Sequence, residues 1–132
     1  VDIDGLEKLT PDEFAKTIDC DLHRTLPELL KDTDYAVLRR VLRAYAAFDQ
    51  EIGYCQGLSF VAAIPLVLGF SELQDFECLN FIVHDVCPGY HGPCLEGYLS
   101  DLAVVSALTS FMLPEIFEQL EELEISLDML AR

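Results

Sequence analysis

The sequence predicts an all-α protein, organised as a helical bundle, and three observations support this prediction. Apolar residues recur at spacings of three and four, which is the period of a helix. Strict alternation of apolar and polar residues, the mark of a half-buried strand, is sustained nowhere. Signals that start and stop helices separate the apolar segments. At 132 residues, the chain is long enough for one domain with its own core.

The first clear helix start is the Thr-Pro-Asp-Glu segment at residues 10–13. This pattern predicts Thr10 as the N-cap, a proline at the first helical position, and Glu13 closing a capping box. The helix is expected to run to about His23, because Pro27 biases the residue before it away from helical backbone.

Two further helices follow. The next one carries a single apolar stripe, made of Tyr35, Leu38, Val41, Leu42, Tyr45 and Phe48. Gly53 is expected to help end it. Residues 57–68 are apolar on all sides, which is typical of a buried central helix, and Pro65 should kink this helix or end it early.

The second half of the chain continues in the same way. A capping box at residues 71–74 opens another helix, and a loop rich in Gly and Pro follows at 88–93. A long helix is expected from Leu95 to Leu113, where Pro114 stops it, and a last helical stretch from Glu115 to about Leu130.

Composition excludes several classes of function. The chain has 8 Lys and Arg against 24 Asp and Glu, a formal charge of -16. This charge argues against binding nucleic acid or anionic lipid, which both require cationic side chains. No apolar run reaches the roughly 20 residues of a transmembrane helix. Hydrophobic residues nevertheless make up 52% of the chain, so we expect an exposed apolar surface that further protein would cover.

Five cysteines, an odd number without a secretory signal, indicate reduced thiols in a cytosolic protein. Four zinc-type ligands lie within or beside the 88–93 loop: His84, Cys87, His91 and Cys94. A small zinc-binding interaction domain is therefore one alternative, but the short spacing between the two ligand pairs disfavours it, and no metal is expected. The sequence shows no basic or acidic partner for a nucleophilic Cys55.

Two segments carry candidate chemistry. In the first, Ile18, Asp21 and Arg24 are spaced by three, so Ile18 should face the core while Asp21 lies one helical turn from Arg24 and holds its guanidinium. In the second, glycines bracket the segment that contains Tyr54 and Gln56, which places the glutamine on a bend before an apolar helix. Taken separately, these residues are more often a solvated charge and a turn residue.

Together the two segments resemble a known family. Ile-x-x-Asp-x-x-Arg followed by Tyr-x-Gln-Gly is similar to the two motifs of the TBC domain in Rab GTPase-activating proteins. The downstream order is also similar, with a tyrosine-containing loop at Tyr90, a helix led by Asp101, and Leu-Pro at 113–114 before another helix. The resemblance covers most of the chain and is most specific at the two motifs.

The resemblance implies a mechanism in which the chain is not itself an enzyme but completes the active site of a GTP-bound Rab-type GTPase. Arg24 would be an arginine finger that stabilises transition-state charge, and Gln56 a glutamine finger that positions the attacking water. Asp21 and Tyr54 match supporting positions. The protein would need no cofactor of its own, since GTP and Mg²⁺ belong to the partner GTPase.

Further expectations follow from the same resemblance. The chain is shorter than a complete TBC domain, so residues 1–132 are expected to be a single domain that forms its N-terminal part, truncated at the C-terminus. The protein would be cytoplasmic, act in vesicle trafficking, and reach membranes peripherally through its GTPase partner or through other regions. The alternative function is a non-catalytic GTPase-binding or scaffold module with the same fold.

Overall fold

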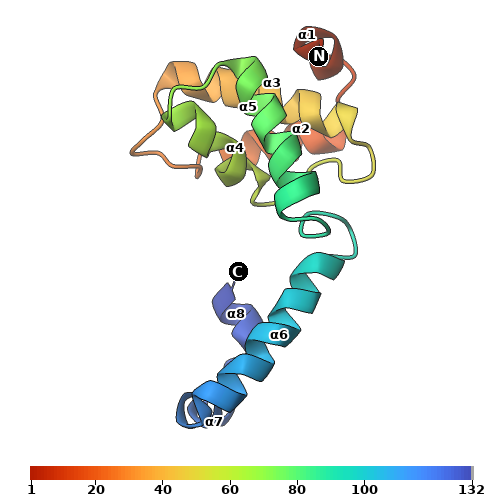
Figure 1. Ribbon diagram of the computed structural model, residues 1–132. Helices are drawn as coiled ribbons and strands as arrows, with labels where there is room; N and C mark the ends of the chain where they lie inside the picture. The colour runs from red at the N-terminus through yellow and green to blue at the C-terminus, as the bar shows by residue number, and fades with distance from the viewer. Residues whose placement is uncertain (132) are drawn as a thin grey trace. The chain divides into compact units, whose positions relative to one another are not determined.

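A computed structural model describes residues 1–131. These residues form eight α-helices and one turn of π-helix, with no strand among them, so the all-α prediction is confirmed. The chain divides into two compact units, residues 1–93 and residues 94–132, which are described separately (Figure 1). The prediction that the chain is the N-terminal part of a larger domain stays a prediction.

The first unit contains five α-helices and the π-helix. They are α1 (Ile3–Glu7), α2 (Asp12–Leu22), α3 (Asp32–Phe48), α4 (Leu58–Val67), α5 (Glu72–Phe81) and η1 (Ile82–Val86). Helix α3 is the central element, because α1, α2, α4 and α5 all contact it (Figure 1). This arrangement gives the longest helix of the unit a neighbour on most of its surface, as a bundle core requires.

The apolar stripe of α3 provides the centre of the core. Leu38, Val41 and Tyr45 are fully buried, and the Tyr45 ring meets the ring of Phe76 edge-on at 6.0 Å between centroids. Phe48, the last member of the predicted stripe, is 50% exposed. The helix was expected to end with the help of Gly53, but it ends at Phe48 and is capped by Asp49.

The predicted start of α2 is wrong in its capping. Helix α2 begins at Asp12 with Pro11 as N-cap, and no side chain of the described residues caps it. The Thr10 hydroxyl instead lies 2.8 Å from the carbonyl oxygens of both Glu7 and Arg43. A tertiary contact with α3 therefore takes the hydroxyl that the local sequence pattern assigned to the helix N-terminus.

Helix α4 is buried on one face only, which corrects the expectation of a helix buried all round. Leu58, Ala62 and Ala63 are inaccessible, whereas Ile64 is 55% exposed and Leu68, just beyond the helix, 71%. In the described residues, α4 packs against α2, α3 and α5, and these neighbours leave its other face open. The helix contains Pro65 and ends soon after it, as the early-ending expectation requires.

Helix α5 opens as predicted, and its interior holds an unusual carboxyl group. Ser71 and Gln74 form the expected capping box. One turn further, Asp75 is fully buried, and neither of its carboxylate oxygens has a hydrogen-bond partner within residues 1–131. Burial, with a contribution from the negative charge of Glu72, raises the pKa of Asp75 to about 7.

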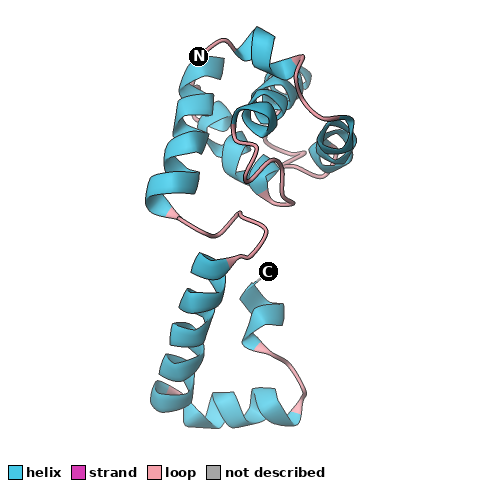
Figure 2. Cartoon of the chain, turned by 90° about the vertical axis from the view of Figure 1, so that its right-hand side faces the viewer, coloured by secondary structure: helices cyan, strands magenta, loops and turns pink. Residues whose placement is uncertain are grey.

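The second unit contains α6 (Glu96–Met112), α7 (Pro114–Glu122) and α8 (Leu127–Ala131). Helix α6 contacts both α7 and α8, and the chain turns sharply between α6 and α7 at Pro114 (Figure 2). The predicted single stretch from Glu115 to Leu130 is wrong, because it breaks between α7 and α8, where Glu124 adopts a left-handed φ of 55°.

Much of the second unit's apolar surface is exposed. No residue of α6 is buried, and Phe111 and Met112 are 85% and 68% exposed. In the described part of the chain, no single helix has the length and apolar composition to span a membrane; α6 and α7 meet that test only as a pair bent by 113°.

Candidate functional site

The candidate site lies in the first unit, where the turn after α2 meets the loop before α4. Helix α2 ends at Leu22, and the amides of Arg24 and Thr25 donate back to the carbonyls of Asp21 and Leu22 at 3.1 Å each. These bonds continue one tight turn, so Arg24 leaves the end of the helix toward solvent. Leu26 then adopts a left-handed φ of 41°, which turns the chain away before Pro27.

The glutamine is held on a bend, as expected. Gly53 and Gly57 both have positive φ, at 61° and 104°, and Gly57 is the N-cap of α4. The backbone amide of Leu58 donates to the carbonyl of Cys55 at 3.2 Å, closing a turn that contains Gln56. The turn exposes the Gln56 side chain beside the first turn of α4.

Asp21 joins the two segments. Its Oδ1 accepts from Nε and Nη2 of Arg24, at 3.1 and 2.7 Å. Its Oδ2 accepts from the hydroxyl of Tyr54 at 2.8 Å. The carboxylate therefore uses one oxygen for each segment, and the contact between Asp21 and Arg24 expected from their spacing is present.

Arg24 and Gln56 are in direct contact. With the amide of Gln56 oriented so that its oxygen faces donors, Oε1 accepts from Nη1 and Nη2 of Arg24 at 3.1 and 2.8 Å. Two residues far apart in the sequence thus present their polar ends at one point of the surface. They lie on the same face of the unit, as the motif pair leads one to expect.

The site consists of buried supporting residues and exposed polar side chains. Asp21 and Tyr54 are 5% and 7% exposed, whereas the Arg24 side chain is 49% exposed. Burial, together with the adjacent Asp21 carboxylate, raises the pKa of the Tyr54 hydroxyl. Tyr54 is therefore protonated at neutral pH and acts as a donor to Asp21. The buried pair of Asp21 and Tyr54 fixes the direction of Arg24, while the guanidinium of Arg24 remains accessible to a ligand.

Two residues of this site escaped the sequence reasoning. The Thr25 hydroxyl lies 2.8 Å from the Asp21 carbonyl oxygen and 2.9 Å from the Ser59 hydroxyl, and both side chains are fully buried. The one available signal was Ser59 itself, a polar residue within an apolar helix.

The four zinc-type ligands near the 88–93 loop do not converge. His84 Nε2 lies 2.9 Å from Asp49 Oδ2, and His91 Nδ1 lies 3.7 Å from Cys55 Sγ. Among residues 1–131, no three side chains of His, Cys, Asp or Glu are grouped as a metal ion requires.

Cys55 does have the histidine partner that the sequence did not reveal, since its thiol contacts His91. Burial raises the pKa of the Cys55 thiol and lowers that of the His91 imidazole. Both shifts favour the neutral forms, and the thiolate is the nucleophilic form of cysteine. The contact is therefore better explained by packing than by nucleophilic chemistry.

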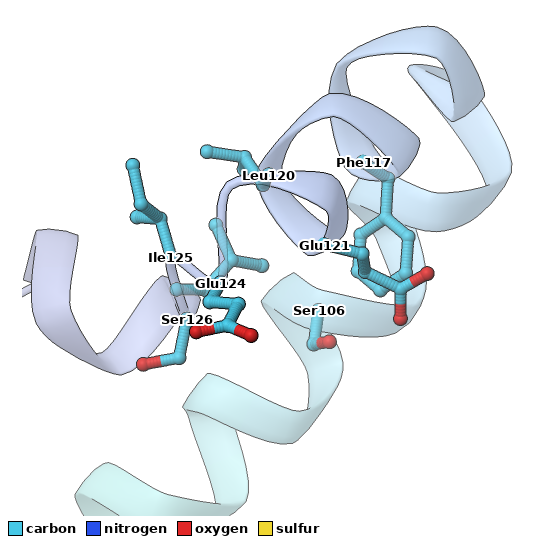
Figure 3. Close-up of a pocket in the computed structure, with 8 residues that line it drawn as sticks. Ser106, Phe117, Leu120, Glu121, Glu124, Ile125 and Ser126 are labelled. Carbon is cyan, nitrogen blue, oxygen red and sulfur yellow. The ribbon is translucent and has the colours of Figure 1, made fainter.

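The second unit contains a pocket of a different kind (Figure 3). It lies among α6, α7 and the segment that leads into α8, and its lining comprises Ser106, Phe117, Leu120, Glu121, Glu124, Ile125, Ser126 and Leu127. The polar groups are hydroxyls and carboxylates, and no cationic side chain of the described residues lines it. This lining offers no donor comparable to the guanidinium of Arg24 for an anionic ligand.

Comparison with known proteins connects the geometry to a family. The Rab-GTPase-TBC domain family matches residues 2–131. The chain is similar to GTPase-activating protein gyp2 of Schizosaccharomyces pombe, with 31% identity over 90% of the chain and 17% of the relative. It is similar to growth hormone-regulated TBC protein 6 of Caenorhabditis elegans, with 35% identity over 92% of the chain and 37% of the relative.

A third relative is growth hormone-regulated TBC protein 1 of Homo sapiens, with 32% identity over 80% of the chain and 33% of the relative. The chain thus spans less than two fifths of the length of each of these relatives. The family match, in contrast, includes both segments of the candidate site and nearly every residue described. The chain belongs to the Rab-GTPase-TBC domain family.

Proposed function

We propose that this chain supplies Arg24 and Gln56 in trans to a GTP-bound Rab-type GTPase and thereby accelerates its GTP hydrolysis. The observation that carries the proposal is the direct contact between these two side chains, because both are accessible and their polar ends meet at one point. A pair of this kind can approach one nucleotide from one side. Family membership supports the same activity, since a relative is named a GTPase-activating protein.

Arg24 is proposed to stabilise charge. During phosphoryl transfer, negative charge is distributed over the phosphoryl oxygens, and an arginine finger increases the rate by roughly 10³- to 10⁵-fold. Asp21 accepts from Nε and Nη2 of Arg24, while Nη1 and the second hydrogen of Nη2 face the oxygen of Gln56. We expect the bonds to Asp21 to hold the guanidinium plane while the bonds to Gln56 are exchanged for phosphate oxygens.

Gln56 is proposed to position the attacking water. An amide offers a donor and an acceptor on one neutral group, so it can bind a water molecule and a second polar group together. With the amide oriented so that its oxygen faces Arg24, that oxygen accepts from the guanidinium in the free chain. This bond keeps both side chains close to their working positions before the GTPase arrives, which lowers the ordering cost of forming the complex.

The proposal assigns GTP and Mg²⁺ to the partner GTPase and no cofactor to this chain. It also places the protein in the cytoplasm, recruited to membranes through its partner. The strongly negative charge of -16 favours recruitment by a protein over direct attraction to anionic lipid.

The test is single-turnover phosphate release from a panel of GTP-loaded Rab GTPases, with the full-length protein added. Arg24→Ala and Gln56→Ala are expected to abolish the acceleration without lowering the melting temperature. Arg39→Ala is a matched control, because Arg39 is 42% exposed and also ion-paired, at 3.0 Å to Asp19. Gln50→Ala serves the same purpose for glutamine, since Gln50 is exposed in the same connection between α3 and α4.

Both controls are expected to keep the wild-type rate. Near-normal rates in both Arg24→Ala and Gln56→Ala would contradict the proposal. If those variants still bound the GTP-loaded partner, the chain would be the non-catalytic binding module instead.

A further inference from the structure

Beneath the tips of Arg24 and Gln56, two buried hydroxyl groups connect the segments that carry them. Thr25 directly follows Arg24, and Ser59 follows Gln56 within the first turn of α4. Their side-chain oxygens lie 2.9 Å apart, and neither residue is accessible to solvent. A buried hydrogen bond thus links the two segments close to both exposed side chains.

The direction of the bonds follows from the available hydrogens. A threonine hydroxyl has one hydrogen, and the Asp21 carbonyl oxygen at 2.8 Å can only accept. Thr25 therefore donates to that carbonyl, and the Ser59 hydroxyl is the donor in its bond with Thr25. The Thr25 carbonyl also accepts from the hydroxyl of Tyr35 at 3.1 Å. Thr25 is thus bound to α2, α3 and α4 together.

We propose that Thr25 and Ser59 are positioning residues whose hydrogen bond sets the distance and direction between Arg24 and Gln56. This inference rests on the function proposed above. The bond between the two exposed side chains is open to competition from water, and it is exchanged when the partner binds. The Thr25–Ser59 bond is inaccessible to water, so it persists through that exchange. It therefore keeps the two segments at a fixed distance and orientation.

The relative position of Arg24 and Gln56 should be sensitive to loss of this hydrogen bond. Donor and acceptor distances are restricted to a few tenths of an ångström. Catalysis by positioned groups is similarly strict, and a misplacement of about 1 Å can lower a rate by about 100-fold. Without the hydroxyl pair, the turn after α2 and the start of α4 retain apolar packing, which fixes relative position less sharply.

A purely structural role would have a different signature. If the two hydroxyls serve only to satisfy one another in the core, their removal lowers the melting temperature and leaves turnover unchanged. A positioning role instead lowers kcat while KM is retained, because the partner still docks but Arg24 and Gln56 are misaligned in the transition state.

The experiment measures kcat and KM for activation of a responsive Rab GTPase by the full-length protein. Thr25→Val keeps the shape of the side chain and removes its hydroxyl, and Ser59→Ala removes the other partner. Each is expected to lower kcat by roughly 10- to 100-fold. The double variant should be no slower than the slower single variant, and Thr25→Ser should recover most of the rate because it restores the hydroxyl.

Thr10→Val is the matched control. Its hydroxyl also joins two elements, with 2.8 Å contacts to the carbonyls of Glu7 and Arg43, but none of these residues belongs to the candidate site. This variant is expected to melt earlier and keep its kcat. If Thr25→Val does not fold, Ser59→Ala still decides the matter, because alanine favours helical backbone.

The outcomes separate the two proposals. A folded Ser59→Ala or Thr25→Val variant with wild-type kcat would overturn the positioning role, while an inactive Arg24→Ala variant would leave the proposed function standing. Full activity in both Arg24→Ala and Gln56→Ala would refute the proposed function itself, and the positioning role with it.

Discussion

The contact between Tyr54 and Asp21 can be tested as a unit by removing one hydroxyl group. Tyr54→Phe deletes the donor that lies 2.8 Å from Asp21 Oδ2 and changes nothing else in the shape of the ring. Because Asp21 is 5% exposed and Tyr54 7%, water has little access to the oxygen that loses its donor. The variant therefore leaves a buried carboxylate oxygen without a partner.

The expected cost follows from that unpaired oxygen. A buried acceptor that loses its partner costs about 1–3 kcal/mol. For a small domain, each kcal/mol lowers the melting temperature by roughly 4 °C, so a decrease of about 4–12 °C is expected. Asp21→Asn is expected to cost a similar amount, because its amide group must face a donor, either Arg24 or Tyr54.

The double variant distinguishes a coupled pair from two independent contacts. Once the Tyr54 hydroxyl is absent, the amide introduced by Asp21→Asn no longer faces that donor, so the two costs should not add. A coupling free energy of about 1 kcal/mol or more is expected from urea unfolding of the four proteins. GTPase activation measured in parallel should fall in both single variants, because Arg24 loses its fixed support.

Tyr45→Phe provides the control for the tyrosine change. Tyr45 is fully buried and donates to Asp49 Oδ2 at 3.1 Å, and neither residue belongs to the candidate site. It should lower stability and leave activation unchanged. Costs at Asp21 and Tyr54 that add to within about 0.3 kcal/mol would refute the view that these residues form one support.

Three further changes test other parts of the chain. Gly53→Ala should lower the melting temperature more than Gly57→Ala. Both positions have positive φ, but only at Gly53 would a Cβ lie 2.4 Å from the Phe14 ring. Equal losses in the two variants would show that backbone strain alone matters. In urea titrations, stability should fall as pH rises from about 4 to about 7, since buried Asp75 retains a proton there that the unfolded chain has lost. Asp75→Asn should flatten this slope, and an unchanged slope would assign it to other groups. Phe111→Ser should reduce self-association in sedimentation experiments without lowering the melting temperature, because Phe111 is 85% exposed; a clear loss of stability would contradict that exposure.

Local periodicity accounts for the parts of the fold that the sequence predicts well. The stripe of α3 and the capping box of α5 depend on residues within one helix. The capping box is present, and the stripe is buried except at its two ends, where Tyr35 is half-buried and Phe48 is exposed. The pairing of Asp21 with Arg24 likewise follows from a spacing of three, which places the residues one turn apart. Tyr54 is different, because only the family resemblance indicated a supporting position for it.

The sequence fails where a distant contact decides the local structure. Thr10 has every feature of an N-cap, but its hydroxyl contacts the carbonyl of Arg43 in α3. The helix breaks near Glu124, where the sequence has no Gly or Pro, so no local helix-breaking residue predicts the break. The contact of Thr25 with Ser59 joins two hydroxyls that sequence spacing cannot relate, and it lies at the centre of the candidate site.

The two motifs form one site because each contributes one buried residue and one exposed residue. The first motif contributes buried Asp21 and exposed Arg24, and the second contributes buried Tyr54 and exposed Gln56. Asp21 accepts a hydrogen bond from the Tyr54 hydroxyl, and Gln56 accepts from the Arg24 guanidinium. The two motifs are therefore hydrogen-bonded to each other both in the buried part of the site and at its surface. A change confined to the buried residue of one motif therefore alters the exposed residue of both, which is why activity should respond to Tyr54 even though its ring does not reach the surface.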